Sequence, residues 1–571
     1  MTILENKDAW WRRAQFYQIW PKSFCDSNGD GYGDLRGIIS KVPYLKDLGV
    51  DAIWCTPCFD SPGKDNGYDI RNYRMIDPKM GTMQDFEELV KVVHDHGMKL
   101  IIDMVFNHCS EEHEWFQKSI QRDPQYDDYF IWRDGTGPDK KGLPNNWGSI
   151  FQGPTWTWNE HRQQYYFHLF AKEQPDLNWE NPKVVEEVKE IVRFWNAKGV
   201  DGYRLDALSH LSKKEGLQSY PTDAIEVKGN YIANGPHMHE RIRLICETIR
   251  EDNPDRVIFG ETSTVPNEEI YLVCEPSRKE LDFTIMFGHV SCDHQYDILK
   301  GKFNYTGLDL SRLKSEYDSY YKHLHGGWLN IYLCNHDQAR IVTRWGDEGE
   351  HLTTCAKMFG MFYSFKRGTP FIFQGEELGM TSWKFTKEEA DDVEFKNAYK
   401  DLVEDKKVLT HDEFMATCHK IGRDCARSPV HWDDSVNAGF TTGKPWLPVI
   451  PNYQTINAKT EAQDPHSVLN FYKKMVATRK AHPALIYGDF KLLEEFANPL
   501  FVYRRQDGDV EFISLSNFSA QTLSADLSSV LAGKVAEVVL SNYEGVTIGA
   551  DSTVNIQPFL GMLIKLNKST V

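Results

Sequence analysis

Short apolar segments alternate with amphipathic segments over most of the chain. In Pro182–Lys198, Val184, Val188 and Ile191 recur at helical spacing, and Gly199 follows to end the helix. Similar patterns predict helices at Ile38–Leu48, Met83–His96, Met238–Arg250 and Ser467–His482. Strands are predicted at Phe16–Trp20, Ala52–Cys55, Lys99–Val105, Asp201–Asp206, Val257–Glu261, Leu281–Phe287, Trp328–Leu333 and Thr369–Phe373. Eight strands, mostly separated by helices, predict an α/β fold, the (β/α)8 TIM barrel.

Three regions depart from this alternation. Residues 109–176 are rich in Trp, Pro, Gly and Asp, which predicts a small domain inserted after strand three, forming one wall of a pocket. Residues 378–440 form a second long excursion. From residue 489 to 571 short alternating runs predict a C-terminal antiparallel β-domain. The barrel itself would then consist of residues 1–108 and 177–488.

Composition narrows the class of protein. The chain has 571 residues, is 41% hydrophobic and 26% charged, and carries a net charge of -18. These values are typical of a globular protein and argue against nucleic acid or an anionic membrane as a partner. Residues 1–13 are charged and lack the apolar core of a signal peptide, and no segment reads as a membrane span. Eleven cysteines without a disulfide framework favour a reducing, cytoplasmic location.

Carboxyl groups stand at the ends of three predicted barrel strands. Asp206, Glu261 and Asp337 end strands four, five and seven, at the rim where barrels carry their chemistry. Any one of them read alone could cap a helix. Three on one rim favour an acid and a nucleophile, because crowded like charges separate carboxyl pKa values. The flanking residues Arg204, His108 and His336 would lie beside them.

The segment Asp26–Asp34 repeats oxygen-bearing side chains at short intervals, which predicts a loop for a hard cation, Ca²⁺ or Mg²⁺. The expected ligands are the side chains of Asp26, Asn28, Asp30 and Asp34 and the carbonyl of Tyr32. An EF-hand is excluded, because Gly37 stands where the twelfth-position Glu is needed. The alternative is a Gly/Asp-rich turn without an ion. Nothing in the sequence indicates an organic cofactor.

Four segments, in this order, resemble the signature regions of glycoside hydrolase family 13, the α-amylase superfamily. They are Asp103-Met-Val-Phe-Asn-His108, Gly202-Tyr-Arg-Leu-Asp206, Phe259-Gly-Glu261 and Asn335-His-Asp337. Gln174-Pro-Asp-Leu-Asn178 and Asp65-Asn-Gly-Tyr68 are similar to the oligo-1,6-glucosidase and α-glucosidase branch. The cation loop also matches that branch.

The resemblance implies a retaining, exo-acting α-glucosidase for short oligosaccharides or disaccharides. It makes Asp206 the nucleophile, Glu261 the general acid and then base, and Asp337 the group that binds the 2- and 3-hydroxyls. It implies substrate contacts from Asp65, Tyr68, His108, Gln174, Arg204, His336 and Arg427. A monomer or weak homo-oligomer is expected.

The linkage that is cut stays open at this stage. Ala207 stands where α-1,6 enzymes of this branch tend to carry Val, which favours α-1,4 or broad specificity. A sugar-transferring enzyme, or one that converts sucrose or trehalose, is the alternative. The stretch after strand six lacks the Arg-Leu-Asp-Arg loop of sucrose isomerases, and no phosphate-binding cluster is evident. A thiol oxidoreductase using Cys55 and Cys58 is disfavoured, because a loop follows them where a helix N-terminus is needed.

Overall fold

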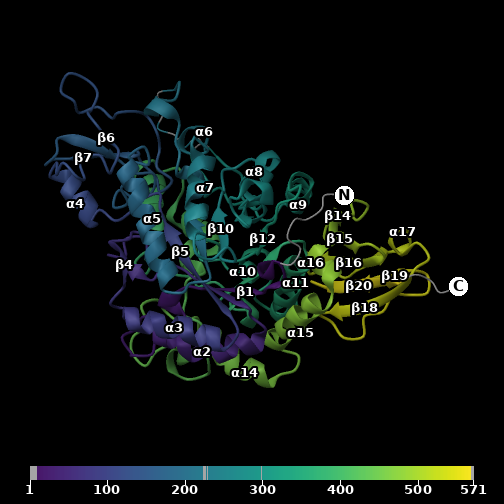
Figure 1. Ribbon diagram of the computed structural model, residues 1–571. Coiled ribbons are helices and arrows are strands. Elements are labelled where there is room, and N and C mark those ends of the chain that lie inside the picture. Colours follow the sequence, from purple (N-terminus) through teal and green to yellow (C-terminus); the bar gives the residue numbers. More distant parts are fainter. Residues whose placement is uncertain (1–8, 223–224, 226, 228, 298, 568–571) are drawn as a thin grey trace.

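Eight parallel strands form a closed barrel in the computed structural model, which describes residues 9–222, 225, 227, 229–297 and 299–567 (Figure 1). The strands follow the order β11-β10-β9-β5-β2-β1-β13-β12, and a parallel bridge between Thr284 and Leu329 closes the ring. The predicted barrel is therefore confirmed. The strands are β1 (Phe16–Ile19), β2 (Ala52–Cys55), β5 (Lys99–Val105), β9 (Gly202–Asp206), β10 (Val257–Glu261), β11 (Phe283–Ile285), β12 (Asn330–Ile331) and β13 (Thr369–Phe373).

Helices surround these strands, and most of them bury one apolar face. Helix α5 begins with Asn181 as N-cap and Pro182 in its first turn, and it buries Val188 and Trp195. The main barrel helices are α2 (Leu35–Leu48), α3 (Met83–Asp95), α5 (Pro182–Ala197), α7 (Met238–Ile249), α9 (Leu310–His323), α11 (Leu352–Ser364) and α15 (Val468–Ala481). Shorter elements are α1 (Trp10–Arg13), α6 (Gly229–Ile232), α8 (Tyr271–Cys274), α10 (Ile341–Trp345), α14 (Ala458–Gln463), α16 (Pro483–Tyr487), β3 (Phe59–Asp60) and β4 (Asn72–Ile76). No helix in these ranges is both long and apolar enough to cross a membrane.

A helix directly follows a strand in a regular (β/α)8 barrel, but the chain after β9 departs from that pattern. Only a 3-10 turn, Leu208–His210, follows Asp206. Ala207 lies in the left-handed region, with φ 47° and ψ 36°, so the backbone turns away from a helical path directly after the strand.

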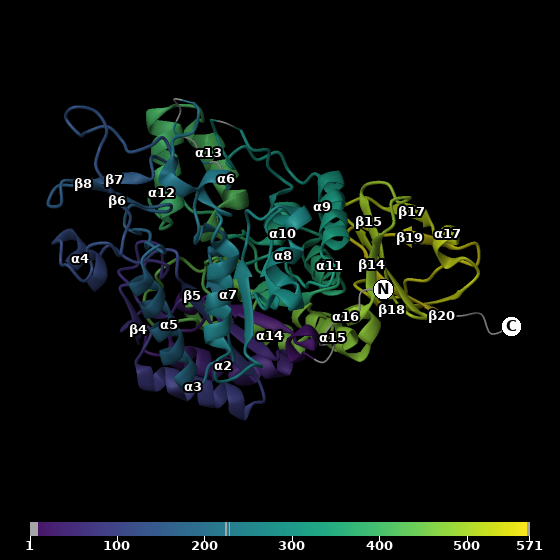
Figure 2. The same cartoon turned by 45° about the horizontal axis from the view of Figure 1, so that its top comes forward.

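The two excursions meet above the carboxyl ends of the barrel strands. Residues 109–176 contain α4 (Glu114–Ile120) and a small sheet of β6 (Trp132–Arg133), β8 (Gln164–Phe167) and β7 (Trp156–Asn159). The second excursion contributes α12 (Val393–Tyr399) and α13 (His411–Ile421), which lie on the same side of the molecule in Figure 2. The Asn397 side chain donates to the carbonyl of Phe151 (3.0 Å), joining the two.

The C-terminal residues form an antiparallel β-domain at the end of the molecule opposite α4 (Figure 1). Its main sheet has the order β14 (Asp489–Leu492), β15 (Leu500–Asp507), β16 (Val510–Asn517), β20 (Gly561–Asn567) and β18 (Val535–Ser541). A second pair, β17 (Leu523–Asp526) and β19 (Thr553–Ile556), and helix α17 (Ser528–Leu531) complete it.

Candidate active site

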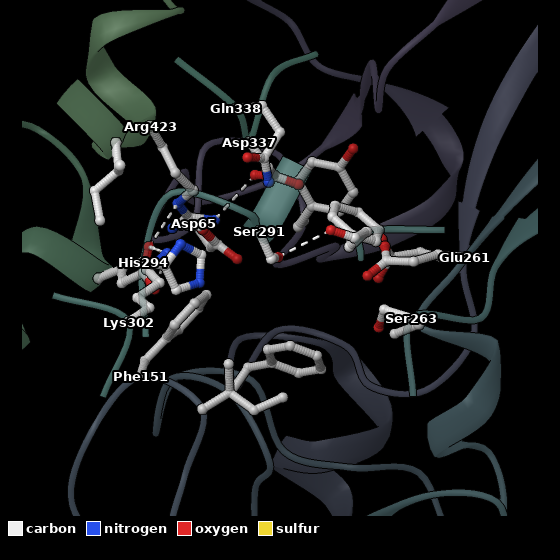
Figure 3. Close-up of a pocket in the computed structure, with 18 of the residues that line it drawn as sticks. Asp65, Phe151, Glu261, Ser263, Ser291, His294, Lys302, Asp337, Gln338 and Arg423 are labelled. Carbon is white, nitrogen blue, oxygen red and sulfur yellow. Dashed lines mark hydrogen bonds and ion pairs between the residues drawn. The ribbon is translucent and has the colours of Figure 1, made fainter. Parts of the chain in front are cut away.

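A cavity of about 280 Å³ opens at the carboxyl ends of the barrel strands. Figure 3 shows Glu261 and Ser263 on one side of it and His294 and Lys302 on the other. Six of the residues proposed from sequence line it: Asp65, Tyr68, His108, Asp206, Glu261 and Asp337. Strand ends and loops that are far apart in sequence therefore supply one site.

Arg204 connects the two central carboxyl groups. Its Nη1 lies 2.5 Å from Asp206 Oδ1, and its Nη2 lies 2.6 Å from Glu261 Oε2. Arg204 and Asp206 are two apart on β9 and so point to the same side. The other two carboxyl groups come from the strands on either side of β9. β10 carries Glu261, and the register with β5 sets Asp103 beside Arg204 (3.0 Å). One fully buried guanidinium thus holds three carboxyl groups.

Burial controls the protonation of Glu261. Removal from water raises its pKa to about 8; Arg204 opposes this, while the negative charges of Asp206 and Asp337 add to it. A carboxyl group that is neutral near pH 7 can donate a proton to a leaving oxygen. Glu261 therefore has the properties of a general acid.

Asp337 has the opposite environment. Burial by itself would raise its pKa, but His336 (3.1 Å), Arg423 and Arg427 outweigh it and hold the pKa well below the usual value. The Gln18 amide donates to His336 Nδ1 (2.7 Å), which leaves Nε2 to carry the proton that faces Asp337 and Tyr68. Asp337 is thus an ionised acceptor suited to sugar hydroxyls.

The inner end of the cavity is closed by a polar network around Asp65. Gln174 donates to Asp65 Oδ2 (3.0 Å) and Arg423 donates to Asp65 Oδ1 (3.1 Å). Burial raises the pKa of Asp65 to about 7, with Arg423 opposing the shift. His108 also lines this end; its Nε2 contacts the carbonyl of Tyr68 and its Nδ1 contacts Asn107, both at 3.2 Å.

Several predicted substrate contacts lie beneath the cavity surface. Arg204, His336 and Gln174 are buried behind the lining residues. Arg427 is fully buried too; it donates to the carbonyl of His336 (2.9 Å) and to Asp337 (3.2 Å). Arg423, four residues earlier, lines the cavity in its place, and the sequence interpretation missed it. The sequence interpretation had named Arg427 for this place.

The outer part of the cavity contains groups that sequence reasoning did not identify. Phe151 and Phe287 present aromatic rings there. Lys302 Nζ pairs with Glu394 Oε1 of α12 (2.6 Å), and both residues line the cavity. In the sequence Lys302 and Glu394 look like ordinary surface charges, and only the fold brings them together.

The expected cation loop folds as a series of tight turns. Asp26 accepts from the backbone of Asn28, Gly29 and Gly31 and from the Thr441 hydroxyl, which fills its acceptor positions. The Asn28 side chain accepts from Asp30, the Asp30 side chain accepts from Tyr32, and Asp34 is the N-cap of α2. Within the described part of the chain, no group of three or more His, Cys, Asp or Glu side chains is arranged to hold a metal. The oxygen spacing suits a hard cation, but these hydrogen bonds compete with one.

Comparison with known proteins places the chain in a family. The model of the α-amylase catalytic domain matches residues 18–488. An oligo-1,6-glucosidase of Parageobacillus thermoglucosidasius is 42% identical over 543 residues, covering 94% of this chain and 95% of that protein. The trehalose-6-phosphate hydrolase of Bacillus licheniformis superposes with a TM-score of 0.92 at 36% identity, covering 98% of this chain and all of that one. The isomaltulose synthase of Klebsiella sp. LX3 gives 0.93 at 37% identity, with the same coverage. The chain thus belongs to the α-amylase family, glycoside hydrolase family 13, and is a glycoside hydrolase.

Proposed function

We propose that the protein is a retaining α-glucosidase that releases glucose from the nonreducing end of short α-glucosides. The observation that carries this is the sharing of Arg204 by Asp206 and Glu261, with the pKa of Glu261 raised to about 8. Two carboxyl groups held side by side, one of them kept neutral so that it can act as an acid, are the pair that a retaining glycosidase needs. The oligo-1,6-glucosidase named above supports the same substrate class.

The reaction uses these two groups twice. Asp206 attacks the anomeric carbon while the glycosidic C–O bond breaks, and the Glu261 proton passes to the leaving oxygen. This yields a glucosyl ester of Asp206 with β configuration. Glu261, now ionised, removes a proton from water, the water oxygen attacks the anomeric carbon, and Asp206 leaves. The product is α-glucose, and both carboxyl groups return to their first state.

The closed inner end accounts for exo action. The contacts of Asp65 with Gln174 and Arg423 fill the space beyond the first sugar. Asp65 and Asp337 supply acceptors for hydroxyl protons, and Arg423 supplies donors for hydroxyl oxygens. His294 and Lys302 also line the cavity, and we place the leaving group beside them.

The roles of Asp206 and Glu261 can be separated by rescue with azide. Asp206→Gly should lose at least about a thousandfold in kcat on p-nitrophenyl α-glucoside, and azide should restore release with β-glucosyl azide as product. Glu261→Gln should accumulate the glucosyl enzyme and give α-glucosyl azide. Near wild-type hydrolysis by Asp206→Asn, with an unchanged circular dichroism spectrum, would overturn the assignment.

Sugar transfer, or conversion of sucrose or trehalose derivatives, is the second candidate. The solved structures of a trehalose-6-phosphate hydrolase and an isomaltulose synthase superpose closely on this chain. Lys302 offers an ammonium at the open end, although Glu394 already neutralises it. Product analysis at high concentrations of maltose, isomaltose, sucrose, trehalose and trehalose 6-phosphate distinguishes hydrolysis from sugar transfer or conversion.

We also propose that the loop 26–34 binds one structural Ca²⁺ or Mg²⁺, supported by oxygens at positions 26, 28, 30 and 34. Added Ca²⁺ should raise the Tm of protein treated with EDTA, and the response should disappear in Asp30→Ala. An unchanged Tm with no ⁴⁵Ca²⁺ bound would leave the loop as a turn and the cap of α2.

We further propose a cytoplasmic location for the protein, supported by its eleven free, buried thiols.

A further inference from the structure

A hairpin forms the outer edge of the cavity beyond β11. Its two arms, residues 293–297 and 301–306, pair through antiparallel bridges between His294 and Tyr305 and between Asp297 and Gly301. Its base is fixed, because Arg344 Nη2 contacts Asp293 Oδ1 (2.7 Å) and the Tyr305 hydroxyl donates to the carbonyl of Arg344 (3.0 Å). We call residues 293–297 and 301–306 the mouth hairpin.

Tyr296 is exposed on this hairpin. Its relative exposure is 72%, the largest of any aromatic residue among the exposed large hydrophobic side chains in the described ranges. A large aromatic ring left in water near a sugar-binding cavity is available to a ligand, because covering it removes apolar surface from water.

The strand register places Tyr296 on the side of the hairpin that faces the cavity. Asp297 and Gly301 exchange both backbone hydrogen bonds (3.3 and 2.7 Å), so Tyr296 lies directly across from Lys302. Cross-strand neighbours project from the same face, with Cβ atoms about 4.5–5.5 Å apart. Lys302 lines the cavity, and so does His294, two residues before Tyr296.

We infer that Tyr296 forms a sugar-binding subsite on the leaving-group side, next after the one at Lys302 and Glu394. The flat C–H face of a pyranose ring would stack on the phenol, while hydroxyls at the ring edge stay in water. Since the inner end holds a single glucose and the first leaving-group sugar lies by Lys302, the ring on Tyr296 is the third unit. The preferred substrates are therefore linear glucosides of three or more units. This inference rests on the proposed function.

The test compares substrates of two and three units. Wild-type enzyme is assayed on maltose and maltotriose and on isomaltose and isomaltotriose, alongside Tyr296→Ala, Tyr296→Phe and Leu299→Ala. Leu299 is exposed on the same tip and serves as the control for lost apolar surface without a ring. In Tyr296→Ala the kcat/KM for the trisaccharides should fall about threefold to tenfold, mainly through KM, with the disaccharide values unchanged. Tyr296→Phe and Leu299→Ala should keep the wild-type ratio.

The possible failures are distinct. If the wild-type enzyme cleaves none of the four substrates, the proposed function fails. If it cleaves them and Tyr296→Ala changes disaccharide and trisaccharide values equally, or changes neither, the subsite at Tyr296 is wrong. An equal fall in the ratio of trisaccharide to disaccharide kcat/KM in Leu299→Ala would also overturn the subsite, because the effect would then belong to the hairpin and not to the ring.

Discussion

Burial decides the protonation of Glu261, and through it the pH range in which the site can work. A general acid must carry its proton when the substrate binds. The raised pKa keeps Glu261 protonated below about pH 8, whereas an ordinary Glu with a pKa of 4.5 would already be ionised at neutral pH. The removal of this carboxyl group from water therefore favours the protonated form that the reaction needs.

The pH profile follows from this. For maltose, kcat/KM should fall as pH rises through about 8, because Glu261 loses its proton there. A 2,4-dinitrophenyl α-glucoside, whose leaving group needs no proton, should show no such fall. An alkaline limb near pH 5 with maltose would contradict the assignment.

Ala207 places a constraint directly beside Asp206. It lines the cavity and lies in the left-handed region, where a β-branched residue is disfavoured. Ala207→Val should lower the free energy of unfolding by about 1–2 kcal/mol and alter the ratio of kcat/KM for maltose to that for isomaltose. Ala207→Gly, which tolerates this backbone, is the control for stability. An unchanged ratio in Ala207→Val would show that this side chain does not select the linkage. The assays are chemical denaturation and initial rates on both disaccharides.

At the scale of elements, a buried ion pair joins the inserted segment to the barrel. Lys213 Nζ lies 2.6 Å from Asp176 Oδ2 and donates to Asn107 Oδ1 (2.9 Å), and Asn107 in turn contacts His108. Burial lowers the pKa of Lys213 and Asp176 opposes the shift. The position of His108 therefore depends on a cation from the loop after β9.

Removal of that cation should be costly. Lys213→Met leaves the buried carboxylate of Asp176 without its charge partner and should lower the free energy of unfolding by about 3–5 kcal/mol. kcat/KM should fall as well, because Asn107 and His108 lose their support. Lys214→Met, at the exposed neighbouring residue, should change the stability by no more than about 0.5 kcal/mol. Equal effects of the two substitutions in urea denaturation would refute the role of Lys213.

Much of the barrel and its catalytic carboxyl groups could be predicted from sequence, because the strands are short apolar runs and two of them, β9 and β10, end in a carboxyl residue. Asp206, Glu261 and Asp337 needed only that pattern and the rule that barrel chemistry lies at strand ends. The contact of Arg204 with Asp103 depends on the register of β9 with β5, which local sequence does not contain. The choice of Arg423 over Arg427 follows from a 3-10 turn, Arg423–Cys425, held by Asp392 and Asp65 from distant loops.

At the scale of the whole molecule, buried cations join the barrel to the C-terminal domain. Arg505 of β15 is fully buried and donates to four carbonyl oxygens of the barrel side, those of Phe365 (2.5 Å), Leu485 (2.6 Å), Ile486 (3.2 Å) and Gly488 (2.7 Å). Arg479 of α15 donates to the carbonyls of Ser364, Lys366 and Leu485 from the other side. The Leu485 carbonyl accepts from both arginines, so Arg505 ties the C-terminal domain into the barrel and the two parts should unfold in a single transition.

The contribution of Arg505 to stability can be tested by comparison with its neighbour Arg504. Arg505→Met leaves buried carbonyl groups without donors and should lower the free energy of unfolding by about 3–5 kcal/mol. Arg504→Met removes a half-buried arginine with a longer contact to Glu511 (3.6 Å) and should cost no more than about 1 kcal/mol. Calorimetry of both variants gives the comparison. Two separate transitions in the wild-type protein would contradict the shared interface.

The same interface has a consequence for synthesis. A ribosome completes every barrel strand and helix before it reaches Arg505, yet the carbonyls of Phe365, Ile486 and Gly488 accept hydrogen bonds from that residue. The nascent barrel must therefore wait, with a turn and the end of α16 unpaired, until β15 leaves the exit tunnel. A chain stalled before residue 505 should be a better substrate for chaperones and proteases than its nearly complete barrel would suggest.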